Sequence, residues 1–169
     1  MAKKKKDGGK RTKTHGHPFV AIHARVFCQA TEDEEKVLEA LTRILGEVEV
    51  SQTTVEGYFG NPIKILSVDT TDRDVLKKMA DVVSAHGKEF LGELETRLDE
   101  DRIFHFRVSK QAAYEGEIEI VRGTAPGGVI DIGLKVEAYP GRWEIGLRNL
   151  REWLAARTTA ENDTNSHQP

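Results

Sequence analysis

The chain has 169 residues, of which 38% are hydrophobic and 31% charged, an ordinary balance for a soluble globular protein. A body of about 140 residues buries roughly two-thirds of its unfolded surface, enough to fold without a disulfide, and the single cysteine excludes an internal one. No apolar run approaches the roughly 20 residues of a membrane span, and no apolar segment follows the basic N-terminus as in a signal peptide. We therefore expect a cytoplasmic protein without a membrane partner.

Basic residues are concentrated at the N-terminus. Residues 1–14 hold seven of them against one acid, a net charge of +6, which leaves −9 for the rest of a chain whose total is −3. The seven are Lys3, Lys4, Lys5, Lys6, Lys10, Arg11 and Lys13. Such an arm attracts polyanions, and RNA is the commonest in a cytoplasm; a solubilising tail with no specific partner is the alternative. We expect residues 1–17 to form a disordered basic tail that binds no metal.

The predicted elements start at Pro18. Residues 19–28, FVAIHARVFC, are β-branched and aromatic and indicate a strand. The TEDE sequence at 31–34 has the pattern of a capping box, with Thr31 as the cap of a helix that ends at Gly46. Two strands at 48–57 and 62–68 flank the turn GYFGNPI, and a long helix over 72–98, capped by Thr71, follows.

The second half of the chain predicts more strands. DRIFHFRVSK, at 101–110, indicates a strand, and a short turn or helical piece follows. Residues 117–122 and 129–138 predict a hairpin across the sequence GTAPGG, and the spacing of Trp143, Leu147, Leu150 and Leu154 predicts a C-terminal helix. The order β-α-β-β-α-β-β-β-α predicts an α+β, two-layer fold over residues 18–158, with helices on one face of a mostly antiparallel sheet and a polar disordered tail at 159–169.

The second face of that sheet is expected to be open. Alternation in the first strand places Val20, Ile22, Ala24, Val26 and Cys28 toward the core and Phe19, Ala21, His23, Arg25 and Phe27 outward. In the strand at 101–110 the outward residues are Ile103, His105 and Arg107, with Lys110 and Gln111 just beyond it. Guanidinium, imidazole and phenyl groups suit RNA phosphates and bases. In the alternative, the C-terminal helix or a partner covers the phenyl rings, and the arginines pair with Glu117, Glu119 or Asp131.

Catalysis has less support from the sequence. There is no GxxxxGK[ST], CxxC, HExxH or GxSxG motif, and alternation buries Cys28, which argues against a nucleophile. His23, Asp33 and His105 are the residues from which an acid–base site could be assembled, but no local spacing requires one. We expect no enzyme activity, cofactor or metal.

Three segments resemble one family: HARVFCQATEDEEKVLEAL (residues 23–41), GYFGNPIKIL (57–66) and RVSKQAAYEGEIEI (107–120). Together they are similar to the archaeal RNA-binding domain family described as a predicted exosome subunit, which is similar in fold to the ribosomal protein of the central protuberance of the large subunit. The resemblance spans about residues 19–138 and implies RNA binding near an exosome or ribosome. By position, the family's patterns fall on Thr31, Glu32, Asp33, Lys36, Val37, Gly60, Asn61, Pro62, Ile63, Arg107, Lys110 and Gln111. The chain departs from the family at Tyr58, where a histidine is expected, and at Ser109, where an acid is common.

The sequence therefore predicts a non-catalytic RNA-binding protein. Beyond the basic arm, the expected contacts are His23, Arg25, Tyr58, Gly60, Asn61, His105, Arg107, Lys110 and Gln111. The glycines of the turn permit positive φ and a concave run of free N–H groups, beside which Tyr58 or Phe59 can stack a base. Two alternatives stay open: an adaptor that docks a protein on the sheet face, and a phosphate-ester hydrolase that uses His23 or His105.

Overall fold

A six-stranded sheet forms the frame of the protein, whose computed structural model describes residues 16–165. The basic residues predicted to bind RNA at 3–6, 10, 11 and 13 (Lys3, Lys4, Lys5, Lys6, Lys10, Arg11 and Lys13) lie outside the described residues. The strands are β1 (Phe19–Cys28), β2 (Ser51–Glu56), β3 (Pro62–Thr70), β4 (Ile103–Ser109), β5 (Ile120–Val121) and β6 (Val129–Val136). Their order is β2-β3-β1-β6-β4-β5, and every neighbouring pair is antiparallel.

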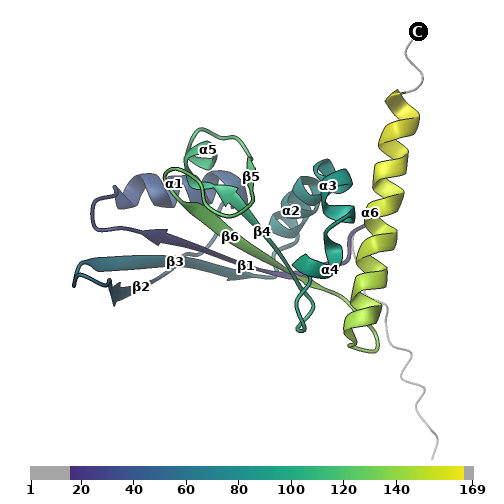
Figure 1. Cartoon of the computed structure of the whole chain (residues 1–169), viewed down its shortest axis with the longest axis horizontal. Helices are drawn as coiled ribbons and strands as arrows, with labels where there is room; N and C mark the ends of the chain where they lie inside the picture. Colours follow the sequence, from purple (N-terminus) through teal and green to yellow (C-terminus); the bar gives the residue numbers. More distant parts are fainter. Residues whose placement is uncertain (1–15, 166–169) are drawn as a thin grey trace, which may run out of the picture.

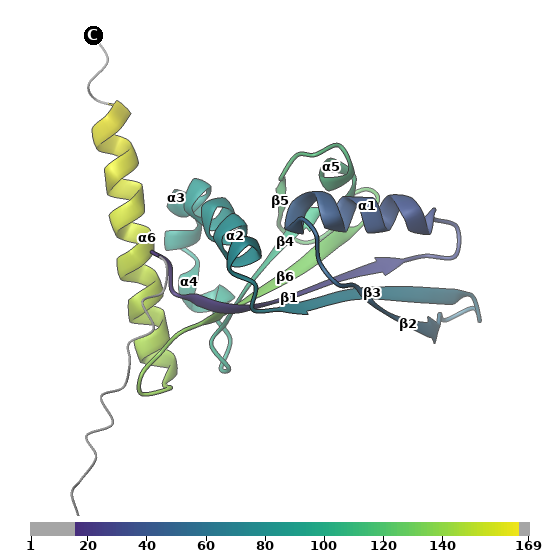
Figure 2. The ribbon, with the colours of Figure 1, turned by 180° about the vertical axis from the view of Figure 1, so that it is seen from behind.

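Helices cover one face of this sheet. They are α1 (Glu34–Leu45), α2 (Arg73–Ala85), α3 (Gly87–Leu91), α4 (Leu94–Arg97), α5 (Lys110–Tyr114) and α6 (Trp143–Asn165). In both views α1, α2, α3 and α5 lie on the same side of the strands, while α6 stands across one end of the sheet beyond α2 to α4 (Figures 1 and 2). The predicted α+β, two-layer class is confirmed, and the opposite face, here called the open face, carries none of these helices.

The core lies between the sheet and the helices. Phe90 of α3 packs edge-on against Phe104 of β4, with ring centroids 5.2 Å apart, and lies 5.8 Å from the ring of Phe106. All three rings are buried. Aromatic pairs in such arrangements add about 0.5–1.5 kcal/mol each beyond their burial. This cluster anchors β4, and with it the outward side chains of that strand.

The predicted helix over 72–98 is wrong in its length, because it is three helices. Its N-cap is Asp72, which accepts from two backbone N–H groups, and not Thr71. His86 ends α2 with φ −105° and ψ 22°, and Gly87 starts α3. A Cβ on Gly87 would lie 2.7 Å from Oγ1 of Thr158, so α6 approaches the chain here closely. The break and the packing of α6 thus occur at the same residue.

The predicted hairpin of residues 117–122 and 129–138 is also wrong. β5 pairs with β4 at Arg107 and Val108, and β4 separates it from β6. The capping box is wrong too, because Asp33, not Thr31, caps α1 by accepting from Glu35 N–H. His17 is buried just before β1, and α6 extends to Asn165.

Two residues at the start of β1 were placed on the wrong face, Phe19 outward and Val20 toward the core. The pairing of β1 with β6 shifts register between Phe19 and Ala21, so Phe19 is buried and Val20 is exposed. Phe19 packs edge-on against Trp153 of α6, at 5.4 Å between ring centroids. The alternative expectation, that the C-terminal helix covers this ring, is therefore confirmed for Phe19.

Candidate nucleic-acid interface

Two rows of polar side chains cross the open face where β1, β6 and β4 lie side by side. In the first row, Arg25 of β1 lies opposite Asp131 of β6, which lies opposite Arg107 of β4 in the strand register. In the second row, His23 of β1 lies opposite Gly133 of β6, which lies opposite His105 of β4. Neighbouring strands are about 4.8 Å apart, so the outer residues of each row are roughly 10 Å apart. The sequence predicted that His23, Arg25, His105 and Arg107 share a face, and the register brings them together.

The rows border a groove of about 590 Å³. Side chains from the rows form one wall, and Thr96, Arg97, Arg122 and Gly123 form the other beyond the edge of β4. Gly133 lies on the floor, where a Cβ would be 2.8 Å from Cγ2 of Ile103. The absence of a side chain at this position lets Ile103 and His105 lean inward and keeps the floor low.

Each histidine of the second row is held by an aspartate. Nδ1 of His23 is 2.6 Å from Asp69, and Nε2 of His105 is 2.6 Å from Asp99. Burial by itself raises the pKa of Asp99, but the hydrogen bonds from His105 and from the backbone N–H groups of Ile103 and Asp101 outweigh it, and the pKa is lowered. Both imidazoles are about half exposed, so their free edges face solvent.

The two arginines of the first row differ in their engagement. Nε of Arg107 donates to Asp131 at 2.8 Å, and its Nη1 donates to the carbonyl of Gly123 at 3.2 Å. The alternative expectation of an arginine paired with Asp131 is thus confirmed for Arg107. Arg25 has no carboxylate partner among the described residues and lies over the ring of Phe27, 5.2 Å from its centroid. Arg25 is the arginine whose charge is available to a ligand.

The β2–β3 turn extends two aromatic rings into solvent. Tyr58 is 97% exposed and Phe59 86%, and the two rings contact each other edge-on at 5.0 Å. Gly60 has φ 75° and donates its N–H to the carbonyl of Gly57, whose own N–H donates to the carbonyl of Asn61. The N–H groups of Gly57 and Gly60, which were expected to be free for an anion, are therefore hydrogen-bonded within the turn. The groups of the turn that remain exposed to a ligand are the two aromatic rings.

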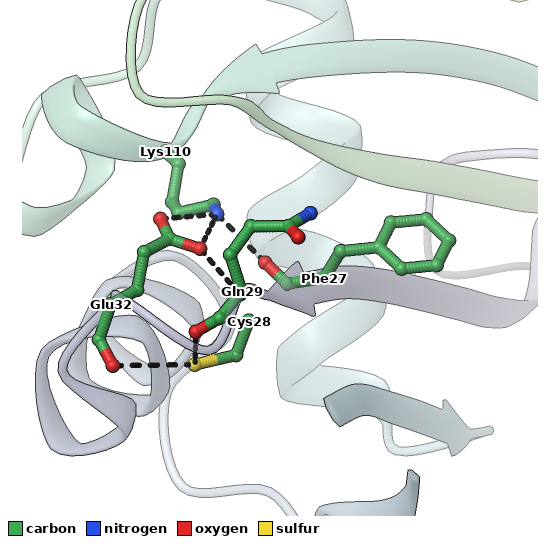
Figure 3. Close-up of polar contacts among 5 residues, drawn as sticks. All are labelled: Phe27, Cys28, Gln29, Glu32 and Lys110. Carbon is green, nitrogen blue, oxygen red and sulfur yellow. Dashed lines mark hydrogen bonds and ion pairs between the residues drawn. The ribbon is translucent and has the colours of Figure 1, made fainter. Parts of the chain in front are cut away.

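Lys110 does not lie on the open face, and its side chain is engaged within the protein. Its side chain is only 10% exposed, and its Nζ donates to Glu32 at 2.8 and 3.1 Å and to the carbonyl of Phe27 at 2.7 Å (Figure 3). These bonds satisfy the ammonium within the protein, so the geometry gives no support to its predicted contact with phosphate. The neighbouring Gln111 is exposed, but it lies by α1 and α5 and not in the groove.

Cys28 adjoins the same cluster. Its Sγ lies 3.7 Å from the carbonyl oxygen of Gln29 and 4.0 Å from that of Glu32 (Figure 3). Burial, together with the nearby Glu32 carboxylate, raises the pKa of the Cys28 thiol. A buried thiol of raised pKa is a poor nucleophile. Within residues 16–165, no group of three or more His, Cys, Asp or Glu side chains is placed to hold a metal ion, and no helix there is long and apolar enough to cross a membrane.

The match to a known family covers the whole sheet core. A family model described as RNA binding matches residues 21–136, from β1 to the end of β6. The chain belongs to this RNA-binding family. RNA-binding protein PAB1135 of Pyrococcus abyssi is 37% identical over 144 residues, which cover 79% of this chain and 92% of that protein. MJ0213 of Methanocaldococcus jannaschii, an uncharacterized protein, is 34% identical over 115 residues, 61% of this chain and 76% of that protein.

A solved structure shares the fold. Mth689, a DUF54 protein from Methanothermobacter thermautotrophicus, superposes with a TM-score of 0.71 at 35% identity, covering 80% of this chain and 98% of its own. These three relatives are archaeal proteins. The family match includes both rows of the open face and the β2–β3 turn, and it leaves the basic arm and α6 outside.

Besides Gly123 and the apolar lining residues, four residues of the groove were missed by the sequence analysis. Arg97 and Arg122 lie on segments that the sequence assigned to a long helix and to a hairpin, so their proximity to β4 was hidden. Arg97 reaches the carbonyl of His105, and Arg122 pairs with Glu93. Thr96 and Gly133 complete the set. A glycine between Ile132 and Leu134 in an otherwise apolar strand was the one available signal, because such a glycine marks a close approach.

Proposed function

We propose that this protein is a non-catalytic RNA-binding protein whose open sheet face is the contact surface. The observation that carries the proposal is the pair of rows, Arg25–Asp131–Arg107 and His23–Gly133–His105, which border a groove on the open face. Membership of the RNA-binding family supports RNA as the ligand.

Arg25 is the main phosphate contact in this proposal. Arg25 is exposed, has no carboxylate partner in the described part of the chain, and lies over the ring of Phe27. A planar guanidinium can bind a phosphate with two parallel hydrogen bonds or stack on a base. Arg107 adds less charge, because Asp131 neutralises it, but its position is fixed by two bonds. His23 and His105 offer ring faces and edges to bases.

The exposed rings of the turn supply a stacking platform beside the groove. Stacking of a base on an aromatic side chain contributes about 1–3 kcal/mol in single-strand binders. Tyr58 and Phe59 bury almost none of their surface in the protein, so their exposure is explained if they stack unpaired bases. Gly60 and Asn61 shape the turn in this proposal and position the rings.

The test compares arginines on the two faces. Arg25→Ala should weaken binding of a single-stranded RNA about tenfold, the factor that corresponds to 1.4 kcal/mol and that a charge-assisted hydrogen bond supplies. Arg73→Ala, an exposed arginine on α2 in the helix layer, is the matched control and should leave affinity within a factor of two. Equal losses in the two variants would remove the open face from the proposal. If the protein binds no RNA, and Phe27→Ala weakens its binding to a partner protein, the alternative function as a protein–protein adaptor is supported instead.

The basic arm supplies attraction that is independent of sequence. If about five phosphates are neutralised in all, the logarithm of the affinity should fall with the logarithm of salt concentration at a slope of roughly −4. Removal of residues 1–14 should make the slope shallower, whereas Tyr58→Ala should lower affinity with the slope unchanged. A flat salt response of the intact chain would exclude this mechanism.

We further propose a cytoplasmic setting in which the protein accompanies a larger RNA machine, either an exosome engaged in RNA processing or degradation, or the ribosome through its RNA. The resemblance of the three sequence segments supports this setting. Crosslinking in cells, followed by identification of the bound RNA and co-purified proteins, tests it. Recovery of neither exosome subunits nor ribosomal RNA would reject the setting and leave RNA binding itself untouched. Assays for RNA cleavage and phosphate release, with and without divalent metal, should show no turnover.

A further inference from the structure

A second hollow lies on the helix layer of the protein. It has a volume of about 300 Å³ and lies between α1 and α5, where it shares no lining residue with the groove on the open face. Its lining residues are Glu32, Asp33, Lys36, Val37, Ala40, Lys110, Gln111, Tyr114 and Gly127. A volume of this size is at the lower end of small-molecule sites, so one nucleotide is an appropriate occupant and a longer segment of RNA is not.

Three charged groups of this pocket are already engaged by the protein. Lys110 and Glu32 form the ion pair described above, which fixes both side chains at one side of the pocket (Figure 3). The carboxylate of Asp33 accepts from Glu35 N–H and caps α1. These bonds make a preorganised wall, and they leave the remaining polar groups of the pocket for a ligand.

Besides the hydroxyl of Tyr114, two polar side chains of the pocket have no hydrogen-bond or carboxylate partner among the described residues. Lys36 is exposed and lies over the ring of Tyr114, with Nζ 6.0 Å from the centroid. The side-chain amide of Gln111 is exposed, and it lies beside Gly127, where φ is 82°. A cation and an amide that both face a pocket provide a phosphate contact and a group that can read the edge of a base.

The rest of the wall is apolar and aromatic. Val37 and Ala40 of α1 are buried, and Tyr114 is half-buried. The guanidinium of Arg43 also lies against Tyr114, 5.2 Å from the ring centroid, and its Nη1 donates to the carbonyl of the same residue. The ring is therefore held in place, as a surface for a flat base should be.

From this arrangement we infer that the pocket between α1 and α5 binds one ribonucleotide, with its base against Val37, Ala40 and Tyr114, its edge on Gln111 and its phosphate on Lys36. An amide side chain forms two hydrogen bonds with the N6–H and N7 groups of adenine, so adenine is the base that we propose for the pocket. The inference rests on the proposed function only where the nucleotide belongs to bound RNA; a free nucleotide has the same chemistry.

The loop between β5 and β6 connects the two sites. Arg122 and Gly123 border the groove on the open face, and Gly127 borders the nucleotide pocket. An RNA strand bound on the open face could follow this loop around the edge of the sheet and place one base in the pocket. In that arrangement the pocket adds base preference to a surface that otherwise contacts phosphates and ring faces.

The first arm of the test uses adenosine monophosphate and the intact chain. Amide signals of Gln111, Tyr114 and Gly127 should shift on titration, and uridine monophosphate should bind at least fivefold more weakly. The double variant Lys36→Ala/Gln111→Ala should lose at least tenfold in affinity for adenosine monophosphate. The matched control Lys77→Ala/Gln52→Ala changes two exposed residues of the same types on α2 and β2 and should have no effect. All four positions are exposed, so the variants are expected to fold, and circular dichroism checks this.

The second arm uses oligoadenylate and oligouridylate RNA. If the pocket holds a nucleotide of the bound RNA, the pocket variant loses the preference for oligoadenylate, whereas Arg25→Ala weakens both RNAs equally. If the pocket serves a free nucleotide, the variant loses adenosine monophosphate and keeps its RNA affinity. Absence of any nucleotide-induced shift at these three amides overturns the inference, whether or not RNA binds. Failure of the open-face proposal instead shows as no effect of Arg25→Ala, so the two failures are distinguishable.

Discussion

Replacement of Lys110 by methionine tests the role that the structure assigns to it. The ammonium is 2.7 Å from the carbonyl of Phe27 and 2.8 and 3.1 Å from the two oxygens of Glu32. Methionine preserves most of the side-chain length and removes the charge, so Glu32 loses its counterion and the carbonyl loses its donor. Removal of one partner from a fully buried ion pair costs about 3–5 kcal/mol. Here the Glu32 side chain is 27% exposed and water can solvate it in part, so we expect about 2–3 kcal/mol.

Urea unfolding measures the loss in unfolding free energy, and thermal unfolding measures the corresponding fall in melting temperature. A chain of this size loses about 2–4 °C of Tm per kcal/mol, so the melting temperature should fall by roughly 4–12 °C. Glu32→Gln, combined with Lys110→Met in a double-mutant cycle, should return a coupling of at least about 1 kcal/mol, because the two groups contact each other. Lys77→Met, at an exposed position on α2, is the control and should stay within about 0.5 kcal/mol of the parent. If Lys110→Met and Lys77→Met lose the same unfolding free energy, Lys110 does not stabilise the fold through Glu32 and the carbonyl of Phe27.

Three further changes test the core, the groove floor and the histidine pair. Phe90→Ala removes a ring that is fully buried between Phe104 and Phe106 and should cost about 3–5 kcal/mol in urea unfolding, while Tyr58→Ala in the exposed turn should cost less than about 0.5. Gly133→Ala places a Cβ 2.8 Å from Ile103 and should lower the unfolding free energy by about 1–3 kcal/mol. Adding Ile103→Ala should recover part of this loss, and equal stability of the single and the double variant would contradict the clash. Because the pKa of Asp99 is lowered in the folded state, its contribution to stability is present above its unfolded pKa of about 3.9 and is lost as the pH falls through the folded value. Asp99→Asn should therefore lower the melting temperature near neutral pH and narrow its difference from the parent below about pH 4, and a constant difference across pH would reject the linkage.

Local patterns predicted the fold class and most of the elements, whereas pairing between distant strands was beyond them. Alternation assigns side chains to a face of the sheet but does not say which strand lies next to which. The chain after β4 contains two extended segments around a glycine-rich turn, a pattern that favours a hairpin. The structure instead inserts β4 between β5 and β6. β4 also packs under Phe90 of α3, and contacts of this kind between separate elements are not part of a local sequence pattern.

The same division holds for the candidate site. His23, Arg25, His105 and Arg107 were predicted together because each lies well inside a regular strand, where a period of two applies. Lys110 was misplaced because the strand ends at Ser109, whose hydroxyl accepts from Ala112 N–H and starts α5. Beyond that cap the alternation no longer determines direction, and the side chain turns toward Glu32. Phe19 was misplaced for a related reason, since the register shift at the start of β1 reverses its face.

In the proposed function, the open face and the basic arm contribute differently to the association and dissociation of RNA. His23, His105 and Arg107 each contact an aspartate, so under the proposed function the face contributes little long-range attraction for RNA. The rest of the chain has a net charge of −9 and opposes approach, and at physiological salt such effects reach only about 8 Å. In the proposed function, the +6 charge of residues 1–14 therefore supplies most of the attraction that brings RNA to the protein. Removal of those residues should lower the association rate several-fold at low salt and alter the dissociation rate less, whereas Arg25→Ala should mainly raise the dissociation rate. Stopped-flow fluorescence with labelled RNA separates the two rates, and an arm deletion that acts only on dissociation would show that the arm holds RNA rather than attracts it.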